Sequence, residues 1–499
     1  MHYESLMFSK SQFEYYRVFE ELSKLPKRPY PLRNLASLTD NSSSKLKYIL
    51  ERIAEVIEKI DPQQANLFLQ SKTLQLDKVT ISLTQFRLTL LRNYSIPFQF
   101  LIWLLKEAQP DLNDFLAAHY ISQSTLTRNV RNLQKYLKIY GIHLSVTNAS
   151  LESKDELLLR QSLFYLFWMG TKGETKLFEP YDIDESLLPK LLQQIPAEHH
   201  YISEKLYRLK LIIQYFRLRQ QHYTQENLRV GQLFRDNPLF DLTLCKDNPL
   251  IPPNYVRSET GGLVTNSLIS PNFTDPDSVL IRSRKEILTE KIPRLLSLGD
   301  DFLTYFETHY FHQRIEEKQR TLLQLNIAQA GAGIWLFRGT FPNLHYFLIQ
   351  EEEVNEANLL YEQQVLTFFI GEQAQQYEEY RDYYSTMRKS FGHILRPYYV
   401  KHMEWTKLKV GIVAEPNSII HDKILLVLNS IYFVDGENFR PAESAKYDLV
   451  VASTASFKTD YPDIPCFVWN IAAKDEDLPY IFYWLRDFFY QKTGKLRFI

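Results

Sequence analysis

The sequence predicts a mainly α-helical, multidomain chain with a pair of helix-turn-helix units at its start and a small α/β domain at its end. Glycine supplies only 15 of the 499 residues, and long stretches place apolar side chains at helical spacing; both features favour helices. A pattern of short helix, turn and long helix occurs twice in the first 160 residues, and β-like runs return only after residue 406. At about 100–200 residues per domain, the length predicts three to five domains.

The first predicted unit, residues 1–85, follows the order helix, short helix, turn, capped long helix and β-hairpin. Its elements are a helix at residues 11–25, a short helix at Leu32–Leu38, a long helix capped by Ser42 or Ser43 with an apolar stripe from Leu46 to Ile60, and a hairpin at Leu67–Leu76 with Lys72 at its tip. Apolar residues three and four apart predict the helices, and alternation predicts the hairpin. This order is typical of a winged helix-turn-helix unit.

The second predicted unit, residues 86–165, repeats this order at an offset of 80 residues, so that Leu32 matches Leu112 and Ser42 matches Ser122. Its elements are a helix at Pro97–Lys106, a short helix at Leu112–His119, a long helix that Ser122 caps and Gly141 closes, and a hairpin at Ile142–Leu151. One helical stripe aligns with almost any other, but a matched short helix, turn, cap and long helix is harder to obtain by chance. The repeat therefore supports both units.

The outward face of each long helix carries side chains that a DNA-reading helix needs. Arginine can bond guanine through two hydrogen bonds, glutamine can read adenine, and hydroxyl groups and lysines can hold phosphates. The candidate DNA-binding residues of the second unit are Ser122, Gln123, Ser124, Thr125, Thr127, Arg128 and Arg131. Those of the first unit are Ser43, Ser44, Lys45, Lys47, Tyr48 and Lys72. A helical bundle with a merely solvated polar face also fits one such helix, and the repeated pair favours DNA binding.

The distribution of charge adds a weaker indication. The net charge is −1, but residues 1–160 hold 21 Lys and Arg against 16 Asp and Glu, whereas the remainder holds 37 against 43. A mildly basic end is what a DNA-binding segment would show.

The rest of the chain is predicted to be helical up to residue 402. Helical patterns fill residues 156–230 and 284–402, and we place two all-helical domains at 166–283 and 284–402. Residues 246–278 are rich in Pro, Asn, Ser and Gly, and are predicted to form a long loop or linker.

Residues 403–499 are predicted to form a small α/β domain with a parallel sheet. Candidate strands at Lys407–Val413, Tyr447–Ser453 and Cys466–Asn470 alternate with helical patterns at Ile419–Leu428 and Asp477–Tyr490. The first loop between strand and helix, residues 414–418, has neither glycines nor a cysteine, so we expect no catalysis there.

Motifs of enzymes and metal sites are absent from the sequence. It has no GxxxxGK(S/T), GxGxxG, HExxH or GxSxG motif. His309 and His312 have only Glu307 and Glu316 as nearby carboxylates at ligand spacing, so no metal or cofactor is expected. The distant Cys245 and Cys466 favour a reduced, cytoplasmic setting. No signal peptide and no apolar run of about 18 residues is seen, so we expect no membrane partner.

Three histidines are candidates for regulatory phosphorylation: His199, His200 and His393. A neutral imidazole nitrogen is a nucleophile near neutral pH, which is what a phosphoryl acceptor requires. A surface or packing role fits each of them as well.

The residues around the second helix-turn-helix unit resemble the central helix-turn-helix of Mga/AtxA-type virulence regulators of Gram-positive bacteria. The matching stretches are Tyr94–Phe100, Leu112–Tyr120 and Ile121–Arg128, while Gly141–Arg160 and Phe164–Trp168 resemble that family's wing and exit helix. The similar order of segments covers nearly the whole chain, and the specific motif covers residues 94–168.

The resemblance implies five parts: two helix-turn-helix units, two helical domains like the PTS-regulatory domain (PRD), and a C-terminal EIIB-like domain. It implies binding to promoter DNA, a homodimer formed through the C-terminal domain, and phosphotransferase proteins that phosphorylate histidines. The DNA-contact role carries over to Ser122–Arg131 and, more loosely, to Ser42–Tyr48. The family's first regulatory histidine falls within residues 203–211, where this chain has Lys205 and no histidine. The cysteine that EIIB enzymes use is missing from residues 414–418.

We therefore expect a cytoplasmic, homodimeric, DNA-binding transcription regulator that is not an enzyme. The resemblance implies an activator of virulence or of surface or metabolic genes, linked to sugar phosphotransferase signalling. The alternative is a phosphotransfer-linked signalling or interaction protein with little DNA binding, and a plain scaffold is a third hypothesis.

Overall fold

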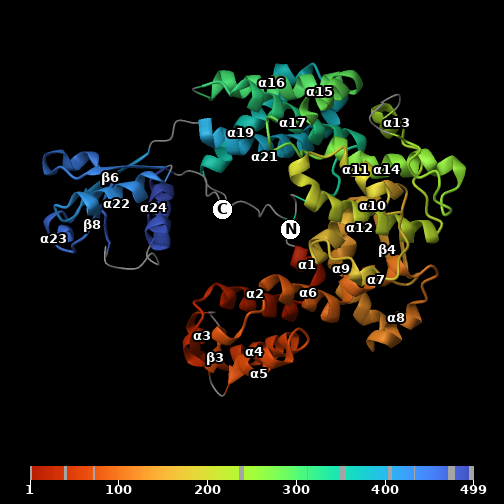
Figure 1. Cartoon of the computed structure of the whole chain (residues 1–499), viewed down its shortest axis with the longest axis horizontal. Helices are drawn as coiled ribbons and strands as arrows, with labels where there is room; N and C mark the ends of the chain where they lie inside the picture. The colour runs from red at the N-terminus through yellow and green to blue at the C-terminus, as the bar shows by residue number, and fades with distance from the viewer. Residues whose placement is uncertain are drawn as a thin grey trace. The chain divides into compact units, whose positions relative to one another are not determined.

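A computed structural model of the chain confirms the mainly helical prediction (Figure 1). It describes residues 3–38, 42–70, 73–234, 241–311, 313–344, 347, 356–402, 407–431, 433–469 and 478–493. They belong to two compact units, of which the first is Met1–Gly299, Thr321–Glu351 and Glu379–Ser390, and the second is Asp300–Arg320, Glu352–Glu378 and Phe391–Ile499. None of the described helices is both long and apolar enough to cross a membrane.

The first winged unit has the predicted order of helices and a sheet of three strands. Its elements are α2 (Lys10–Lys24), β1 (Pro29–Pro31), α3 (Leu32–Leu38), α4 (Ser43–Glu58), α5 (Pro62–Phe68), β2 (Leu69–Gln70) and β3 (Thr73–Gln75), with the antiparallel strand order β1-β3-β2. The apolar stripe of α4 is buried as predicted, with Leu46, Leu50 and Ile53 fully covered.

Two features of this unit differ from the prediction. The predicted hairpin begins too early, because residues 67 and 68 end the helix α5 and the strands start at Leu69. The third strand, β1, lies between two prolines and was not predicted, since proline lacks the amide donor of a strand and is tolerated at an edge. The predicted hairpin tip at Lys72 lies outside the described residues.

The second winged unit follows the prediction closely. Its elements are α6 (Leu83–Tyr94), α7 (Ile96–Lys106), α8 (Leu112–His119), α9 (Gln123–Ile139), β4 (Ile142–Ser145), β5 (Ser150–Ser153) and the exit helix α10 (Glu156–Thr171). The strands β4 and β5 pair as an antiparallel hairpin from Ile142 opposite Ser153 to Ser145 opposite Ser150. Gly141 has a φ of +67°, a left-handed conformation that glycine adopts without strain after a helix end.

The short N-terminal helix α1 (Tyr3–Met7) packs into this second unit, although the first unit follows it in sequence. Tyr3 is buried and donates its hydroxyl to the carbonyl of Leu166 at 2.9 Å. Glu4 pairs with Arg87 at 2.8 Å. Asn132 of α9 donates to the carbonyl of Ser5 at 3.0 Å, so the N-terminus holds α9 from one side.

Beyond α10 the first compact unit consists of further helices. They are α11 (Leu187–Leu192), α12 (His200–Arg219), α13 (Leu228–Phe234), α14 (Val256–Ile269) and α15 (Leu280–Lys291), and the chain continues into α16 (Pro293–His309) and α17 (Glu317–Leu336). Short 3-10 helices lie at Leu76–Lys78, Lys176–Phe178, Ala197–His199, Pro253–Tyr255, Glu378–Tyr383 and Pro441–Lys446.

The prediction of a loop or linker over residues 246–278 is wrong, because this stretch contains the buried helix α14. The pair Gly261 and Gly262, which indicated a loop, sits inside that helix. A Cβ on Gly261 would lie 2.9 Å from Val230, and one on Gly262 would lie 3.2 Å from Leu157. The glycines therefore allow close packing between helices rather than a turn.

The second compact unit contains α19 (Glu356–Ile370), α20 (Glu372–Gln375), most of α21 (Tyr384–His402) and the C-terminal α/β part. Its helical part is packed around aromatic rings. Phe302 lies 5.2 Å from Phe368 and 5.6 Å from Phe391 between ring centroids, and Tyr361 lies 4.5 Å from Tyr399.

The C-terminal part is the predicted α/β domain with a parallel sheet. Its elements are β6 (Leu408–Val413), α22 (Ser418–Asn429), β7 (Val434–Asn438), β8 (Leu449–Ala452), α23 (Phe457–Asp460), β9 (Cys466–Val468) and α24 (Leu478–Thr493). The four strands are parallel in the order β7-β6-β8-β9. The strand β7 was not predicted, because its sequence of Val, Asp, Gly, Glu and Asn is mostly polar.

Candidate DNA-binding surface

The helix α9 begins after a tight turn that its own sequence encodes. Tyr120 ends α8 with a φ of +52°, which reverses the chain. Ser122 then caps α9 by accepting a hydrogen bond from the amide of Thr125 at 3.2 Å. The inner stripe Leu126, Val130 and Leu133 is fully buried. These features fix which face of α9 points outward.

The outward face brings together most of the residues predicted for DNA reading. Gln123, Ser124, Thr127, Arg128 and Arg131 line one shallow, open hollow and are all exposed. Within the described residues, no carboxylate lies at ion-pair distance from Arg128 or Arg131. Their charges are therefore available to an anionic partner.

Four predicted hydroxyl groups are already engaged in local hydrogen bonds. The Ser122 oxygen lies 3.0 Å from that of Thr125, which is half-buried, and 2.9 Å from that of Ser124. Thr127 donates its hydroxyl to the carbonyl of Gln123 at 2.9 Å. Ser122 and Thr125 thus shape the start of the helix, and the exposed long side chains are better placed to reach a ligand.

Two further basic residues, Lys135 and Lys138, were missed by the sequence analysis. Both are exposed, and with Arg128 and Arg131 they follow the spacing three, four, three along α9. That spacing places all four on one face of the helix. The spacing is visible in the sequence, but a recognition helix was expected to act only through its first turns.

The wing is fastened to this helix. Gln134 of α9 donates to the carbonyl of Leu144 in β4 at 3.0 Å. The tip of the hairpin exposes Thr147 and Asn148, and the amide of Asn148 donates to the Ser145 oxygen at 3.1 Å. A fixed wing beside a recognition helix can reach the DNA backbone next to the groove that the helix enters.

The helix α4 of the first unit presents a different surface. Ser43, Ser44, Lys45, Lys47 and Tyr48 are all exposed, as predicted. However, Lys45 forms an ion pair with Glu14, and Lys47 lies 3.8 Å from Glu51.

The Tyr48 ring also has neighbours, because the guanidinium of Arg52 lies over it at 5.3 Å. Exposed ion pairs contribute little free energy and can be exchanged for phosphate contacts. The surface of α4 is therefore more nearly neutral than that of α9.

The candidate regulatory histidines lie on different elements. The Nε2 atom of His199 is 3.1 Å from the hydroxyl of Thr274, and that of His200 is 2.9 Å from the carbonyl of Ile195. His393 is half-buried within α21. His199 and His200 belong to the first compact unit, and His393 belongs to the second compact unit.

His309 and His312 are the histidines at which the sequence led us to expect no metal. Nδ1 of His309 lies 2.8 Å from the carbonyl of Tyr305, and His312 lies outside the described residues. No group of three or more metal-ligating side chains occurs in the described part of the chain.

A capped recognition helix, a short preceding helix and a wing define a winged helix-turn-helix of the DNA-binding class. Residues 79–167 match the family model of the Mga helix-turn-helix domain. The chain therefore carries a Mga-type helix-turn-helix domain, from just before α6 to within α10, and the resemblance drawn from residues 94–168 is confirmed. Comparison with curated proteins gives no match. The domain match supports a DNA-binding transcription regulator.

We expect Ser122→Ala to loosen the first turn of α9 by about 1 kcal/mol, because the amide of Thr125 loses its acceptor. Hydrogen exchange of the amides at the start of α9 should become about fivefold faster in the full chain. Ser124→Ala is the control, since the exposed Ser124 contacts the Ser122 hydroxyl but accepts no amide of the helix start. An equal effect of both substitutions would show that the cap does not hold this turn.

Proposed function

We propose that this protein is a homodimeric transcription activator that binds promoter DNA with α9 of its second helix-turn-helix unit. The observation that carries the proposal is the exposed pair Arg128 and Arg131 on the outer face of a helix within the Mga-type domain, which have no carboxylate partner among the residues that the structure describes. In a major groove such a face would contact base edges and phosphates at once.

Each part of the face has a role in the proposal. Gln123 and Arg128 lie within the first two turns of α9, where base edges come within reach. Arg131 serves the backbone or a guanine. Lys135 and Lys138 continue the stripe toward the end of the helix and hold phosphates. Because phosphate contacts release counterions, the affinity should fall steeply with rising salt.

In the proposal, the first winged unit adds further contacts with the DNA. Its residues Lys45 and Lys47 would exchange their carboxylate partners for phosphates, and the serines at the start of α4 would add hydroxyl donors. Its contribution to affinity is smaller than that of α9, since each phosphate contact must first break an ion pair. Two units on one chain would cover two neighbouring stretches of the duplex.

The C-terminal α/β part serves dimerisation rather than catalysis in this proposal. The loop after β6, residues 414–418, has no cysteine. Cys466 lies in β9, where burial raises the pKa of its thiol, so it is a poor nucleophile. We take this part as EIIB-like in role, the helices before it as PRD-like, and the link to sugar phosphotransferase proteins, virulence or metabolic genes as what the family resemblance implies.

Two measurements separate this proposal from the phosphotransfer alternative. Genome-wide mapping of bound DNA should give discrete promoter sites for the native protein and none for a variant without Arg128 and Arg131. The native protein should also be incubated with the general phosphotransferase proteins and labelled phosphoenolpyruvate. Label on His199 or His200 together with negligible DNA binding would favour the signalling protein, and neither binding nor label would favour a scaffold.

A further inference from the structure

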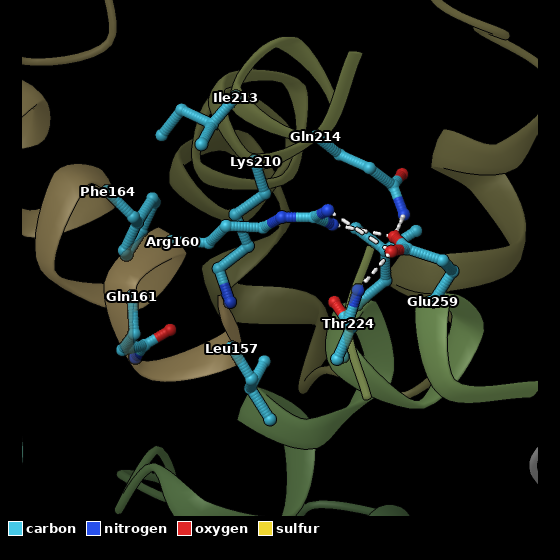
Figure 2. Close-up of a pocket in the computed structure, with 11 residues that line it drawn as sticks. Leu157, Arg160, Gln161, Phe164, Lys210, Ile213, Gln214, Thr224 and Glu259 are labelled. Atoms are coloured by element: carbon cyan, nitrogen blue, oxygen red, sulfur yellow. Dashed lines mark hydrogen bonds and ion pairs between the residues drawn. The ribbon is translucent and has the colours of Figure 1, made fainter. Parts of the chain in front are cut away.

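A small pocket lies where the exit helix of the second winged unit meets the helices that follow it (Figure 2). Its walls come from α10, α12 and α14 and from the segment after α12. Leu157, Phe164, Ile213 and Leu263 line it with apolar groups, and Gln161, Lys210 and Thr224 line it with polar ones. All of these residues belong to the first compact unit.

A buried ionic network forms one wall of the pocket, and its charges are matched within it. Arg160 bonds Glu259 at 2.6 and 3.1 Å and Glu156 at 2.9 Å. Arg217 holds Glu156 from the other side at 2.8 and 2.9 Å. Figure 2 shows that Gln214 and the backbone of Thr224 also point at the Glu259 carboxylate, at 2.7 Å each. Two arginines thus balance two glutamates.

The positive charge of Lys210 is not balanced in this way. Its amino group points into the space that Leu157, Gln161 and Thr224 surround (Figure 2). It lies 4.9 Å from the ring centroid of Phe164 and 5.8 Å from that of Tyr207. No carboxylate is at ion-pair distance from it within the described residues. Arg160 on α10 and Glu259 on α14 are the other charged residues of the lining, and they are bonded to each other.

Two buried hydrogen-bond donors of the same pocket also lack partners. Nε2 of Gln161, a side chain 5% exposed, and Oγ1 of Thr224, which is 3% exposed, form no hydrogen bond within the described residues. The Gln161 side chain also interacts with the hydroxyl of Tyr165, but no hydrogen bond of normal geometry forms at its Nε2. Leaving a buried donor unsatisfied costs about 1–3 kcal/mol, so an acceptor placed here would be stabilised by both.

We propose that this pocket binds a small monovalent oxyanion, a short-chain carboxylate, whose oxygens meet Lys210, Gln161 and Thr224. One negative charge would balance the single unmatched ammonium, and the apolar walls would receive a short hydrocarbon end. Binding of this anion does not require that the protein bind DNA.

The size of the pocket restricts the ligand further. Its volume is about 30 Å³, and one buried water needs about 10–15 Å³ on the same scale. Formate and acetate therefore fit, whereas an aromatic acid would have to displace the lining. A divalent anion such as sulfate would leave one charge unmatched next to Glu259 and is disfavoured.

Burial affects the charge of Lys210 itself. Removal from water lowers the pKa of its amino group to about 7. A bound anion stabilises the ammonium form, so binding above pH 7 must take up a proton. The affinity for a carboxylate should accordingly fall as the pH rises, by about 20-fold between pH 6.5 and 8.5.

The test is calorimetric titration of the full chain with sodium acetate at constant ionic strength, against sodium chloride as the control salt. We expect saturable binding of acetate, weaker at pH 8.5 than at pH 6.5, and none of benzoate or sulfate beyond the chloride background. Absence of saturable binding by formate and acetate at pH 6.5 would overturn the proposal. So would equal binding of sulfate.

Two substitutions locate the site. Lys210→Met keeps an unbranched apolar side chain of nearly the same length, removes the charged amino group and should abolish acetate binding. Gln161→Glu puts a carboxylate beside Lys210 and should block acetate in the same way. Folding of both is checked by thermal unfolding, where Lys210→Met should be at least as stable as the native chain, because an unmatched buried charge is removed. Undiminished acetate binding by the folded Lys210→Met protein would contradict the assignment.

Discussion

Replacing Arg128 and Arg131 together by alanine should lower the affinity for promoter DNA by about 100-fold. A well-placed arginine contributes roughly 1–3 kcal/mol to discrimination between bases. Two of them together therefore contribute enough for a loss of about 100-fold. Both side chains are exposed, and in the described part of the chain neither has a carboxylate partner, so their loss removes no ion pair that holds α9 in place. The substitution therefore acts on binding and not on folding.

The measurement is a gel-shift or anisotropy titration of the full chain at several salt concentrations. If both arginines reach phosphates, the slope of log affinity against log salt should fall by about 2. The matched control is Lys190→Ala with Lys285→Ala, which removes the same charge from exposed helical positions away from α9. Equal binding by the arginine variant and the native chain would refute the assignment of α9.

A second comparison separates reading from holding. Lys135→Ala with Lys138→Ala removes the far half of the basic stripe on α9. We expect a loss of about tenfold that is the same for specific and unrelated DNA, because phosphate contacts carry no sequence information. A loss confined to the specific site would instead assign base contacts to this end of the helix.

The elements around α9 could be predicted from the sequence because their limits are encoded locally. The cap at Ser122, the stripe from Leu126 to Leu137 and the glycine after the helix each act within a few residues. The same reasoning failed at α14, where Gly261 and Gly262 serve contacts with Val230 and Leu157, far away in sequence. A glycine pair reads as a turn unless the packing partner is known.

The two surfaces differ in the same respect. The spacing of exposed side chains on one helix is visible in the sequence, so most of the α9 face was predicted. The pairing of Lys45 with Glu14 was not, because it depends on how α2 packs on α4. The pocket around Lys210 could not be predicted at all, since α10, α12 and α14 are brought together only by the fold.

Glu259→Gln should destabilise the first compact unit strongly, by about 3–5 kcal/mol. The carboxylate is 1% exposed and accepts hydrogen bonds from Arg160, Gln214 and the amide of Thr224. Without its charge, Arg160 and Arg217 share Glu156 alone, and one buried guanidinium is left unbalanced. A lower midpoint of thermal unfolding and faster hydrogen exchange in α10 and α14 would be the result.

The control is Glu286→Gln, which breaks the exposed pair between Arg282 and Glu286 and should change stability by less than about 1 kcal/mol.

The dependence of stability on pH gives an independent check of the network. Burial raises the pKa of Glu156, but the bonds from Arg217 and Arg160 outweigh it and hold that pKa below its usual value. Its stabilisation is thus complete above the ordinary glutamate range and disappears only as the pH falls through the lowered pKa.

Equal effects of Glu259→Gln and Glu286→Gln would mean that the network does not join α10 to α14. That result would also weaken the case for the pocket, because the balance of the two arginines by the two glutamates is what leaves Lys210 as the unmatched charge. A large loss of stability for Glu259→Gln alone would show that the ionic network at the pocket wall joins α10 to α14. A ligand bound there would then contact the helix that leads directly from the wing of the DNA-binding unit.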